Sequence, residues 1–337
     1  MEVRPTHRSV KVKDASQPST ARYAARDAAA FLGFSEEDAY RVGLVATELA
    51  TNLVKHASGG EFLVCGRRSD SDREVEMLAV DRGPGMRDVH LSLSDGHSTA
   101  GTPGNGLGAV QRLADSFDIY SQAGRGTVVL ATVRMRRAPA AEQRVFQVRG
   151  VSVAKHGETL CGDAWQWAAE PDAISLILVD GLGHGLQAHQ AATAAIGVVA
   201  PGRSSSAVEL IQQMHAGTRH TRGAAAAVAR IDRRAATVTY AGIGNISASI
   251  VKSTAVRHAV SLNGTLGHEV RAFREYTYPW DQQSTIVMHS DGLGSHWALD
   301  AYPGLRQHDP LVAAALLYRD FSRERDDVTV VVGREVT

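Results

Sequence analysis

The sequence has few cysteines, few aromatic residues and no excess of charge of either sign. Its two cysteines, Cys65 and Cys161, fit neither a disulfide framework nor the spacing of a metal site. Aromatic residues make up 6% of the chain, too few for a surface on which nucleic-acid bases stack. Lysine plus arginine equals aspartate plus glutamate at 36 each, so there is no broad basic field. We therefore expect no nucleic-acid partner.

Long apolar runs are also missing. No stretch of about 18 apolar residues is present to span a membrane. Residues 1–13 lack the apolar core of a signal peptide. These absences predict a cytoplasmic protein with reduced thiols and no membrane partner. With 337 residues, the chain is long enough for two domains of ordinary size.

The first part of the chain has the pattern of helices followed by an antiparallel sheet. Apolar periodicity predicts helices over 17–34 and 36–57, the second with Ser35 as its cap and acidic residues in its first turn. Alternating patterns predict strands, and a further short helix precedes the last of them. The predicted strands are 8–13, 61–68, 74–81 and a hairpin over 117–135, and the short helix is 105–117. We expect an α+β domain over 1–135.

The pattern changes after a charged, alanine- and proline-containing stretch at 136–145, which we interpret as a linker. Many short apolar strands then alternate with three helical segments, at 185–200, 207–217 and 309–324. Many strands with few helices predict stacked sheets flanked by helices over 146–337. The predicted fold class is therefore α+β, with an α/β-sandwich domain followed by a β-sandwich domain.

Four individually weak motifs follow one another in the first domain. Glu48 and Asn52 are four residues apart and share a helix face, a spacing that is also common on solvated faces. The strand at 74–80 ends in Asp81, whose carboxylate could accept a hydrogen bond from an exocyclic amine, and a glycine turn follows. A second glycine-rich run leads into a helix whose free amides suit phosphate. The glycines concerned are Gly83 and Gly85, then Gly104, Gly106 and Gly108, and Thr127 heads a later strand.

This ordered set over residues 10–135 resembles the GHKL family of ATP-binding domains, with its pattern E-x-x-x-N, D-x-G-x-G, G-x-G-x-G and G-T. The resemblance implies ATP and Mg²⁺ as ligands. It implies that Asp81 binds the adenine amine, that Asn52 holds Mg²⁺, and that Glu48 orients or deprotonates the attacking hydroxyl. It further implies that the glycine turns, Gly83 and Gly85 at the base and Gly104, Gly106 and Gly108 at the phosphates, bind the nucleotide with Thr127 in support.

Within that family, the stretch 93–127 is most similar to the serine/threonine switch kinases of bacterial stress signalling. No dimerisation helix with a phospho-acceptor histidine precedes it, so we do not expect a sensor histidine kinase. The resemblance implies a substrate with a STAS domain, such as an anti-sigma-factor antagonist or a stressosome scaffold. Such a kinase needs mainly positioning and charge neutralisation.

The second domain carries aspartates where apolar strands meet glycine turns. "DGLGHG" at 180–185 and "DGLGSH" at 291–296 each follow an apolar strand. One acid in this position commonly starts a turn, but here two are joined by Asp163 and by the pair Asp326 and Asp327. A carboxylate cluster without thiols suits Mg²⁺ or Mn²⁺, and two such ions can share a hydroxide nucleophile. We interpret the DGLG copies as two strand ends that serve one site.

The order GD, DGxGHG, GN, SDG and DDxT over about 146–334 resembles the metal-dependent protein phosphatases of the protein phosphatase 2C fold, in their SpoIIE-like branch. The resemblance implies two Mn²⁺ or Mg²⁺ ions. It implies that Asp180 is catalytic and bridges both ions, and that the Gly181 carbonyl is a ligand. Asp163, Asp291 and Asp326 would complete the metal ligands, while Asp327 stands where the family often has asparagine.

His184 lies beside this predicted site and has two interpretations. It is either a proton donor to the leaving serine oxygen or a residue that structures the glycine loop.

Together the resemblances predict a bifunctional bacterial signalling switch. It would phosphorylate and dephosphorylate serine or threonine on STAS-domain regulators, with sigma-factor regulators as additional candidate partners. Two alternatives stay open. In one, an ATP-binding domain that transfers nothing regulates the phosphatase; in the other, the chain is a non-catalytic module that sequesters a sigma-factor regulator.

Overall fold

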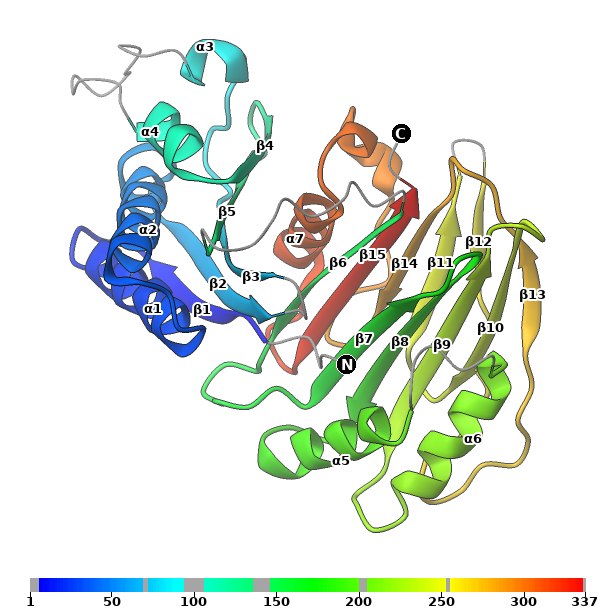
Figure 1. The fold of residues 1–337 in the computed structure, drawn as a ribbon. Helices are drawn as coiled ribbons and strands as arrows, with labels where there is room; N and C mark the ends of the chain where they lie inside the picture. The colour runs from blue at the N-terminus through cyan, green and yellow to red at the C-terminus, as the bar shows by residue number, and fades with distance from the viewer. Residues whose placement is uncertain are drawn as a thin grey trace. The chain divides into compact units, whose positions relative to one another are not determined.

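The computed structural model describes residues 6–68, 72–93, 106–135, 146–199, 205–252 and 255–335. The chain forms two compact units, one of residues 7–143 with 304–319 and one of residues 1–6, 144–303 and 320–337 (Figure 1). The predicted linker at 136–145 lies outside the described residues, so the boundary between domains 1–135 and 146–337 stays a prediction. In the described part of the chain, no helix is long and apolar enough to cross a membrane.

The unit around residues 7–143 is built on one sheet of order β1-β2-β3-β5-β4, in which all neighbouring strands are antiparallel. Helices α1 and α2 pack against one face of this sheet (Figure 1). The elements are β1 (Arg8–Val12), α1 (Gln17–Phe31), α2 (Glu36–Ala57), β2 (Gly60–Arg68), β3 (Arg73–Val80), α3 (Val89–Leu93), α4 (Gly106–Leu113), β4 (Ser116–Gln122) and β5 (Gly126–Arg134). This arrangement confirms the predicted α+β class of the first domain.

Helix α2 begins and ends as its sequence predicts. The Ser35 hydroxyl oxygen accepts the N–H of Asp38 at 3.1 Å, and the first turn is acidic, which suits the positive end of the helix dipole. Leu49 and Leu53 are buried in the core between helix and sheet. The helix ends at Ser58, whose φ of 57° turns the chain into β2.

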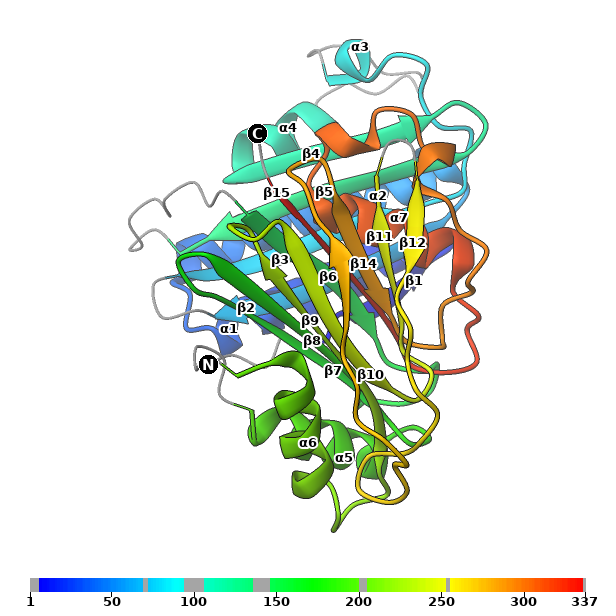
Figure 2. The ribbon, with the colours of Figure 1, turned by 90° about the vertical axis from the view of Figure 1, so that its right-hand side faces the viewer.

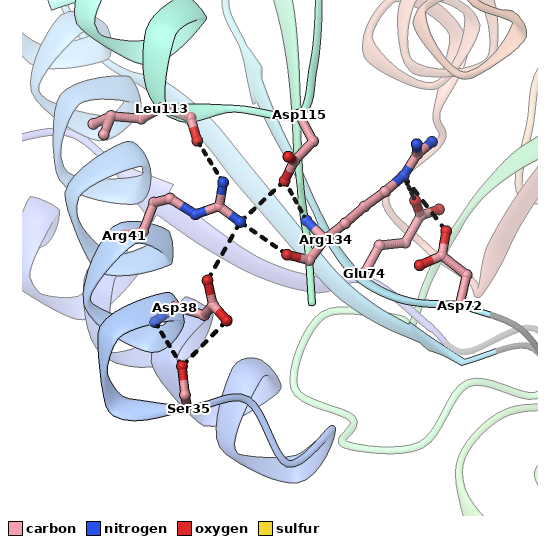
Figure 3. Close-up of polar contacts among 8 residues, drawn as sticks. All are labelled: Ser35, Asp38, Arg41, Asp72, Glu74, Leu113, Asp115 and Arg134. Carbon is pink, nitrogen blue, oxygen red and sulfur yellow. Dashed lines mark hydrogen bonds and ion pairs between the residues drawn. The ribbon is translucent and has the colours of Figure 1, made fainter. Parts of the chain in front are cut away.

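Arg41 connects α2 to the end of α4 and to β5 (Figure 3). Its guanidinium donates to the carbonyls of Leu113 at 3.5 Å and Arg134 at 2.8 Å, and it pairs with Asp115 at 3.1 Å. Charged hydrogen bonds from a guanidinium that is only 14% exposed restrict the spacing of these elements. This spacing bears on function, because α2 carries Asn52 and α4 carries the predicted phosphate-binding glycines.

A helix from the far end of the chain, α7 (Pro310–Phe321), lies on the other face of the same sheet. Leu63, Leu78 and Leu130 point to this face by strand alternation and are buried. Hydrogen bonds near both ends of α7 tie residues 308–319 to this unit. They join Tyr318 Oη to Glu61 Oε1 (3.0 Å), Arg319 Nη1 to the Asp81 carbonyl (3.1 Å), His308 Nδ1 to Asp118 Oδ1 (2.8 Å) and Asp309 N to Asp118 Oδ2 (2.6 Å). The sequence predicts this helix but not the unit to which its residues 310–319 belong.

The second unit is a β-sandwich. One sheet has the order β13-β10-β9-β8-β7 and the other β12-β11-β14-β15-β6, with all neighbours antiparallel. Trp165, Leu178, Tyr240 and Met288 belong to one buried cluster formed by both sheets. Figure 2 shows α5 and α6 over the sheet of β7 to β10, against which Ile177 and its neighbours pack. The predicted β-sandwich flanked by helices is confirmed.

The remaining elements of this unit complete the chain order. They are β6 (Phe146–Val153), β7 (Asp163–Ala169), β8 (Ala173–Gly181), α5 (Leu186–Gly197), α6 (Ala207–Gly217), β9 (Ala224–Asp232), β10 (Thr237–Ile243), β11 (Ser247–Val251), β12 (Val256–His258), β13 (Tyr276–Pro279), β14 (Thr285–His289) and β15 (Val328–Glu335). Short 3-10 helices cover Leu299–Ala301 and Leu305–Gln307, of which the second lies in the unit with α7.

A chain that ends at residue 135 lacks α7 and should expose the sheet face that carries Leu63, Leu78 and Leu130. We expect a peptide of residues 304–321 to raise the unfolding temperature of this shortened chain and to lower its binding of a hydrophobic dye. The reason is that burying each large aliphatic side chain contributes about 1.5–3 kcal/mol. Thermal unfolding and dye fluorescence measure the effect, with a peptide of scrambled order as the control. Identical melting curves with both peptides would contradict the placement of α7 in this unit.

Candidate functional sites

The half-buried flank of α2 meets the start of α4. A Cβ at Gly106, the first residue of α4, would lie 3.1 Å from Oδ1 of Asn52 and 3.6 Å from Oε2 of Glu48. The Asn52 Nδ2 is buried and has no hydrogen-bond partner among the described residues. The structure therefore brings Glu48, Asn52 and Gly106 together. Gly108 lies buried in α4, whereas Gly104 lies outside the described residues.

Asp81 follows β3 and receives backbone hydrogen bonds on one carboxylate oxygen. Its Oδ1 accepts the N–H of Gly83 at 2.8 Å and the N–H of Thr127 at 3.2 Å, and its own N–H donates to the Thr127 carbonyl at 2.9 Å. Burial raises the pKa of Asp81, and the two N–H groups act in the opposite direction. A buried carboxylate whose Oδ2 remains for a ligand suits an amino donor such as that of adenine.

Two glycines beside Asp81 allow a close approach of backbones. Gly126 has a φ of +86°, and a Cβ there would lie 2.1 Å from the Asp81 carbonyl oxygen. Gly85 has a φ of +63°, and a Cβ there would lie 2.1 Å from the carbonyl oxygen of Gln122. Any other residue would collide with backbone at either position, which explains the glycines of the D-x-G-x-G and G-T motifs.

Asp180 lies at the centre of a group of aspartates in the second unit. Asp163 and Asp180 stand opposite each other on the neighbouring strands β7 and β8. Burial raises the pKa of Asp180 to about 9, with further contributions from the negative charges of Asp163, Asp291, Asp326 and Asp327. Burial also raises the pKa of Asp163 to about 7. Shifts in this direction mean that burial and like charges outweigh nearby positive charge, such as that of Arg323, which lowers the pKa of Asp291.

The two DGLG copies come from different sheets. Asp180 ends β8 in one sheet, and Asp291 follows β14 in the other. A Cβ at Gly181 would lie 2.0 Å from the carbonyl oxygen of Ala188 in α5, whereas a Cβ at Gly292 would lie 2.1 Å from that of Asp327. Each glycine thus allows a different backbone segment to approach. The negative charge of Asp291 also raises the pKa of Asp180. This pattern speaks for one joint site and against a structural repeat.

Hydrogen bonds from the second sheet and from a β-turn orient the aspartates. Ser290 Oγ donates to Asp163 Oδ2 at 2.6 Å and accepts the N–H of Thr329 at 2.9 Å. Asn245 Nδ2 donates to Asp291 Oδ2 at 2.7 Å. No motif assigned a role to Ser290 or Asn245, although they stand in the SDG and GN patterns next to the expected residues.

Asp326 and Asp327 have different surroundings. Asp327 is buried, and its Oδ1 accepts the N–H of Lys155 at 2.9 Å. Asp326 is half-buried, and its Oδ1 accepts the N–H of Asp327 at 2.9 Å. Both raise the pKa of Asp180, so both carboxylates contribute negative charge to the centre.

The donor chemistry of this centre fits a hard divalent cation. The ligands available are carboxylates, and the Asp163 Oδ1 is buried with no hydrogen-bond partner in the part of the chain that the structure describes. Among the described residues, no three acidic, histidine or cysteine side chains already converge as a preformed metal site. Side-chain rotation on binding would have to complete the coordination. The ligand set Asp163, Asp180, Gly181, Asp291 and Asp326 is therefore a proposal that the donor chemistry supports.

His184 pairs with a glutamate that no motif indicated. Its Nδ1 lies 2.7 Å from Oε1 of Glu158, and both side chains are at least one-third exposed. A Cβ at Gly185 would lie 2.8 Å from Oε2 of the same glutamate. Glu158 thus lies against both the imidazole of His184 and the Gly185 turn that follows Asp180.

Comparison with known proteins assigns both halves of the chain. Residues 12–133 match the family described as histidine kinase-like ATPase domain, and residues 170–334 match stage II sporulation protein E (SpoIIE). The chain is 35% identical over 116 residues to the serine/threonine-protein kinase RsbT of Bacillus subtilis (strain 168), covering 34% of this chain and 87% of that kinase. It is 22% identical over 201 residues to the phosphoserine phosphatase RsbX of the same strain, covering 57% of this chain and 96% of that phosphatase.

A solved structure is similar to 57% of this chain. It comes from work on the bacterial stressosome as a modular system adapted to control secondary messenger signaling. Its sequence identity is 30% and its TM-score 0.52, and the match covers 57% of this chain and 100% of the solved chain.

Replacing Ser290 by alanine removes the donor to Asp163 while leaving every aspartate in place. We expect the affinity for Mn²⁺ to fall about tenfold to hundredfold, the usual effect of losing a residue that orients a metal ligand. Titration calorimetry with Mn²⁺ measures the change. Ser175→Ala, another buried serine of this unit, is the matched control. Equal affinities of Ser290→Ala and the unaltered chain would remove Asp163 from the proposed ligands.

Proposed function

The chain belongs to the histidine kinase-like ATPase family in its N-terminal part and to the SpoIIE family of protein phosphatase 2C type in its C-terminal part, and from this we propose a bifunctional enzyme. Its C-terminal part would be a metal-dependent protein serine/threonine phosphatase and its N-terminal part a protein serine/threonine kinase. The observation that carries the proposal is the group of aspartates from both sheets around Asp180.

In the phosphatase centre, Asp163, Asp180, Asp291 and Asp326, with the Gly181 carbonyl, would hold two Mn²⁺ or Mg²⁺ ions. When bound, such ions lower the pKa of water and supply a hydroxide nucleophile at neutral pH. The central position of Asp180 among the other carboxylates suits a bridging role. In the hydrolysis, a water oxygen bonds to phosphorus and the ester P–O bond breaks. The products are the free serine or threonine hydroxyl and inorganic phosphate.

In the kinase centre, the proposed roles follow the order of the motifs. Asp81 would accept the adenine amine on Oδ2, while its Oδ1 stays bonded to the Gly83 and Thr127 amides. Asn52 lies beside the start of α4, where Mg²⁺ and the phosphates would bind. Glu48 lies beside the same residue, Gly106, and would orient or deprotonate the substrate hydroxyl that attacks the terminal phosphorus. Positioning and charge neutralisation are what phosphoryl transfer needs most.

Both centres would act on a STAS-domain regulator in a partner-switching pathway. The named relatives catalyse opposite chemistry: one is a serine/threonine-protein kinase and the other a phosphoserine phosphatase. Joining the two activities in one chain raises the local concentration of each around a common target. The direction of the switch would then depend on ATP, on the metal or on the partner.

Two single substitutions should separate the two activities. We expect Asp180→Asn to slow removal of phosphate from a phosphorylated STAS protein about a hundredfold or more, because the central carboxylate that would bridge the ions loses its charge. We expect Glu48→Gln to abolish phosphorylation of the same protein by ATP and Mg²⁺. Phosphoserine and phosphothreonine are measured by mass spectrometry, and each variant is the control for the other activity.

Four results would contradict this proposal in different ways. Phosphorylation that survives Glu48→Gln removes the kinase assignment, and dephosphorylation that survives Asp180→Asn removes the phosphatase assignment. ATP hydrolysis without any phosphoprotein points instead to a regulatory nucleotide-binding domain. Tight binding of the STAS protein without turnover in either direction points to sequestration.

A further inference from the structure

A guanidinium group lies beside the glycine loop that follows Asp180. A Cβ at Gly183 would lie 3.1 Å from Nη1 and 3.5 Å from Nη2 of Arg222. The two loops are also joined by a backbone hydrogen bond, in which the N–H of Leu182 donates to the carbonyl of Gly223 at 3.0 Å. Arg222 is therefore placed at the turn that carries the predicted metal-binding carbonyl.

Arg222 is exposed, and no carboxylate forms an ion pair with it within the described ranges of the chain. The glutamate of the adjacent turn, Glu158, is engaged by His184 at 2.7 Å. The aspartates around Asp180 are held instead by Ser290, Asn245 and the Lys155 amide. The charge of Arg222 thus remains available to an anion that approaches the acidic centre.

Arg222 is part of a basic patch on two neighbouring loops. A Cβ at Gly223 would lie 2.7 Å from Cδ2 of His268, which brings residues 218–223 against residues 264–270. The pKa of His215 is lowered by burial first and then by Arg219 and His268. Both of these side chains therefore lie near His215. The exposed members of the basic patch are Arg219, His220, Arg222 and His268.

We propose that Arg222 binds the phosphoryl oxygens of the phosphoserine or phosphothreonine substrate and holds the ester against the Asp180 centre. The proposal rests on the phosphatase function above and assigns a residue that no motif indicated. A cation beside the loop that follows Asp180 attracts a phosphate dianion and so favours its binding there. The planar guanidinium matches two phosphoryl oxygens at once, which an ammonium group does not.

The role of Arg222 in the reaction is electrostatic. A water oxygen forms the new bond to phosphorus, the bond to the serine or threonine oxygen breaks, and the leaving oxygen takes up the proton that the water releases. Arg222 takes no part in this proton transfer. It stabilises the negative charge on the non-bridging oxygens, and the remaining basic patch favours acidic residues beside the phosphorylated one.

The test compares Arg222→Ala and Arg222→Lys with the unaltered full chain in two assays. The first is hydrolysis of p-nitrophenyl phosphate with Mn²⁺. We expect alanine to raise KM about tenfold to hundredfold with a smaller change in kcat, and lysine to restore part of the loss. The second is calorimetric binding of inorganic phosphate in the presence of Mn²⁺, in which we expect a similar loss of affinity. Arg234→Ala, an exposed arginine at the other end of β9, is the matched control.

The two assays distinguish this proposal from the phosphatase function on which it rests. If the unaltered chain hydrolyses the ester and Arg222→Ala changes neither KM nor phosphate affinity, Arg222 does not bind the phosphoryl group and the phosphatase function stands. If the unaltered chain binds phosphate but does not hydrolyse the ester, and Arg222→Ala binds phosphate more weakly, the phosphatase function fails and the anion site stands. Equal losses in Arg234→Ala, or no phosphate binding by the unaltered chain, would overturn the proposal.

Discussion

The burial of the carboxylates around Asp180, followed by their mutual repulsion, is the constraint to which the second unit is adapted. Like charges in a poorly solvated junction of two sheets favour protonation, as the raised pKa values of Asp163 and Asp180 show. The protein offsets these charges only in part, because Arg323 lowers the pKa of Asp291 but does not outweigh burial. It holds the carboxylates with Ser290, Asn245 and a backbone amide, all uncharged. A centre that is oriented but whose negative charge is only partly offset favours a ligand that brings positive charge, and a divalent cation suits it for this reason.

The unit of residues 7–143 contains a similar buried carboxylate, that of Asp81. Asp81 also follows a strand, is also buried, and is also held by uncharged N–H donors, here those of Gly83 and Thr127. The two sites differ in their number of carboxylates. Asp81 is a single acid with one oxygen held by the protein, and this arrangement suits a neutral amine donor rather than a metal. The two halves therefore suit different ligands, because they differ in how many carboxylates they bring together.

Local patterns in the sequence are enough for most of the fold and for much of the site. Capping by Ser35, the apolar periodicity of α2 and the alternating strands depend on near neighbours, so they can be predicted. Asp163, Asp180 and Asp291 stand beside glycines that the backbone itself requires. Arg222 and Glu158 could not be predicted, because loop-to-loop contacts bring them to the site without a motif of their own. Helix α7 was predicted as a helix, but the sheet against which a helix packs depends on long-range surfaces that periodicity does not encode.

The chain passes from one unit to the other and back through α7, and this order bears on both proposed activities, phosphorylation and dephosphorylation. Residues 304–319 belong to the unit of residues 7–143, and the chain then returns to the other unit at Asp320, shortly before Asp326 and Asp327. The Arg319 side chain is buried and donates to the carbonyl of Asp81, the residue proposed to bind adenine. Neither unit is thus one continuous segment, and a cut at 136–145 does not separate them. An isolated C-terminal fragment would keep α7 but lose the strands to which Tyr318 and Arg319 bond. We therefore expect the proposed phosphatase activity to depend on the whole chain, because residues 304–319, shortly before the last aspartates, belong to the unit of residues 7–143.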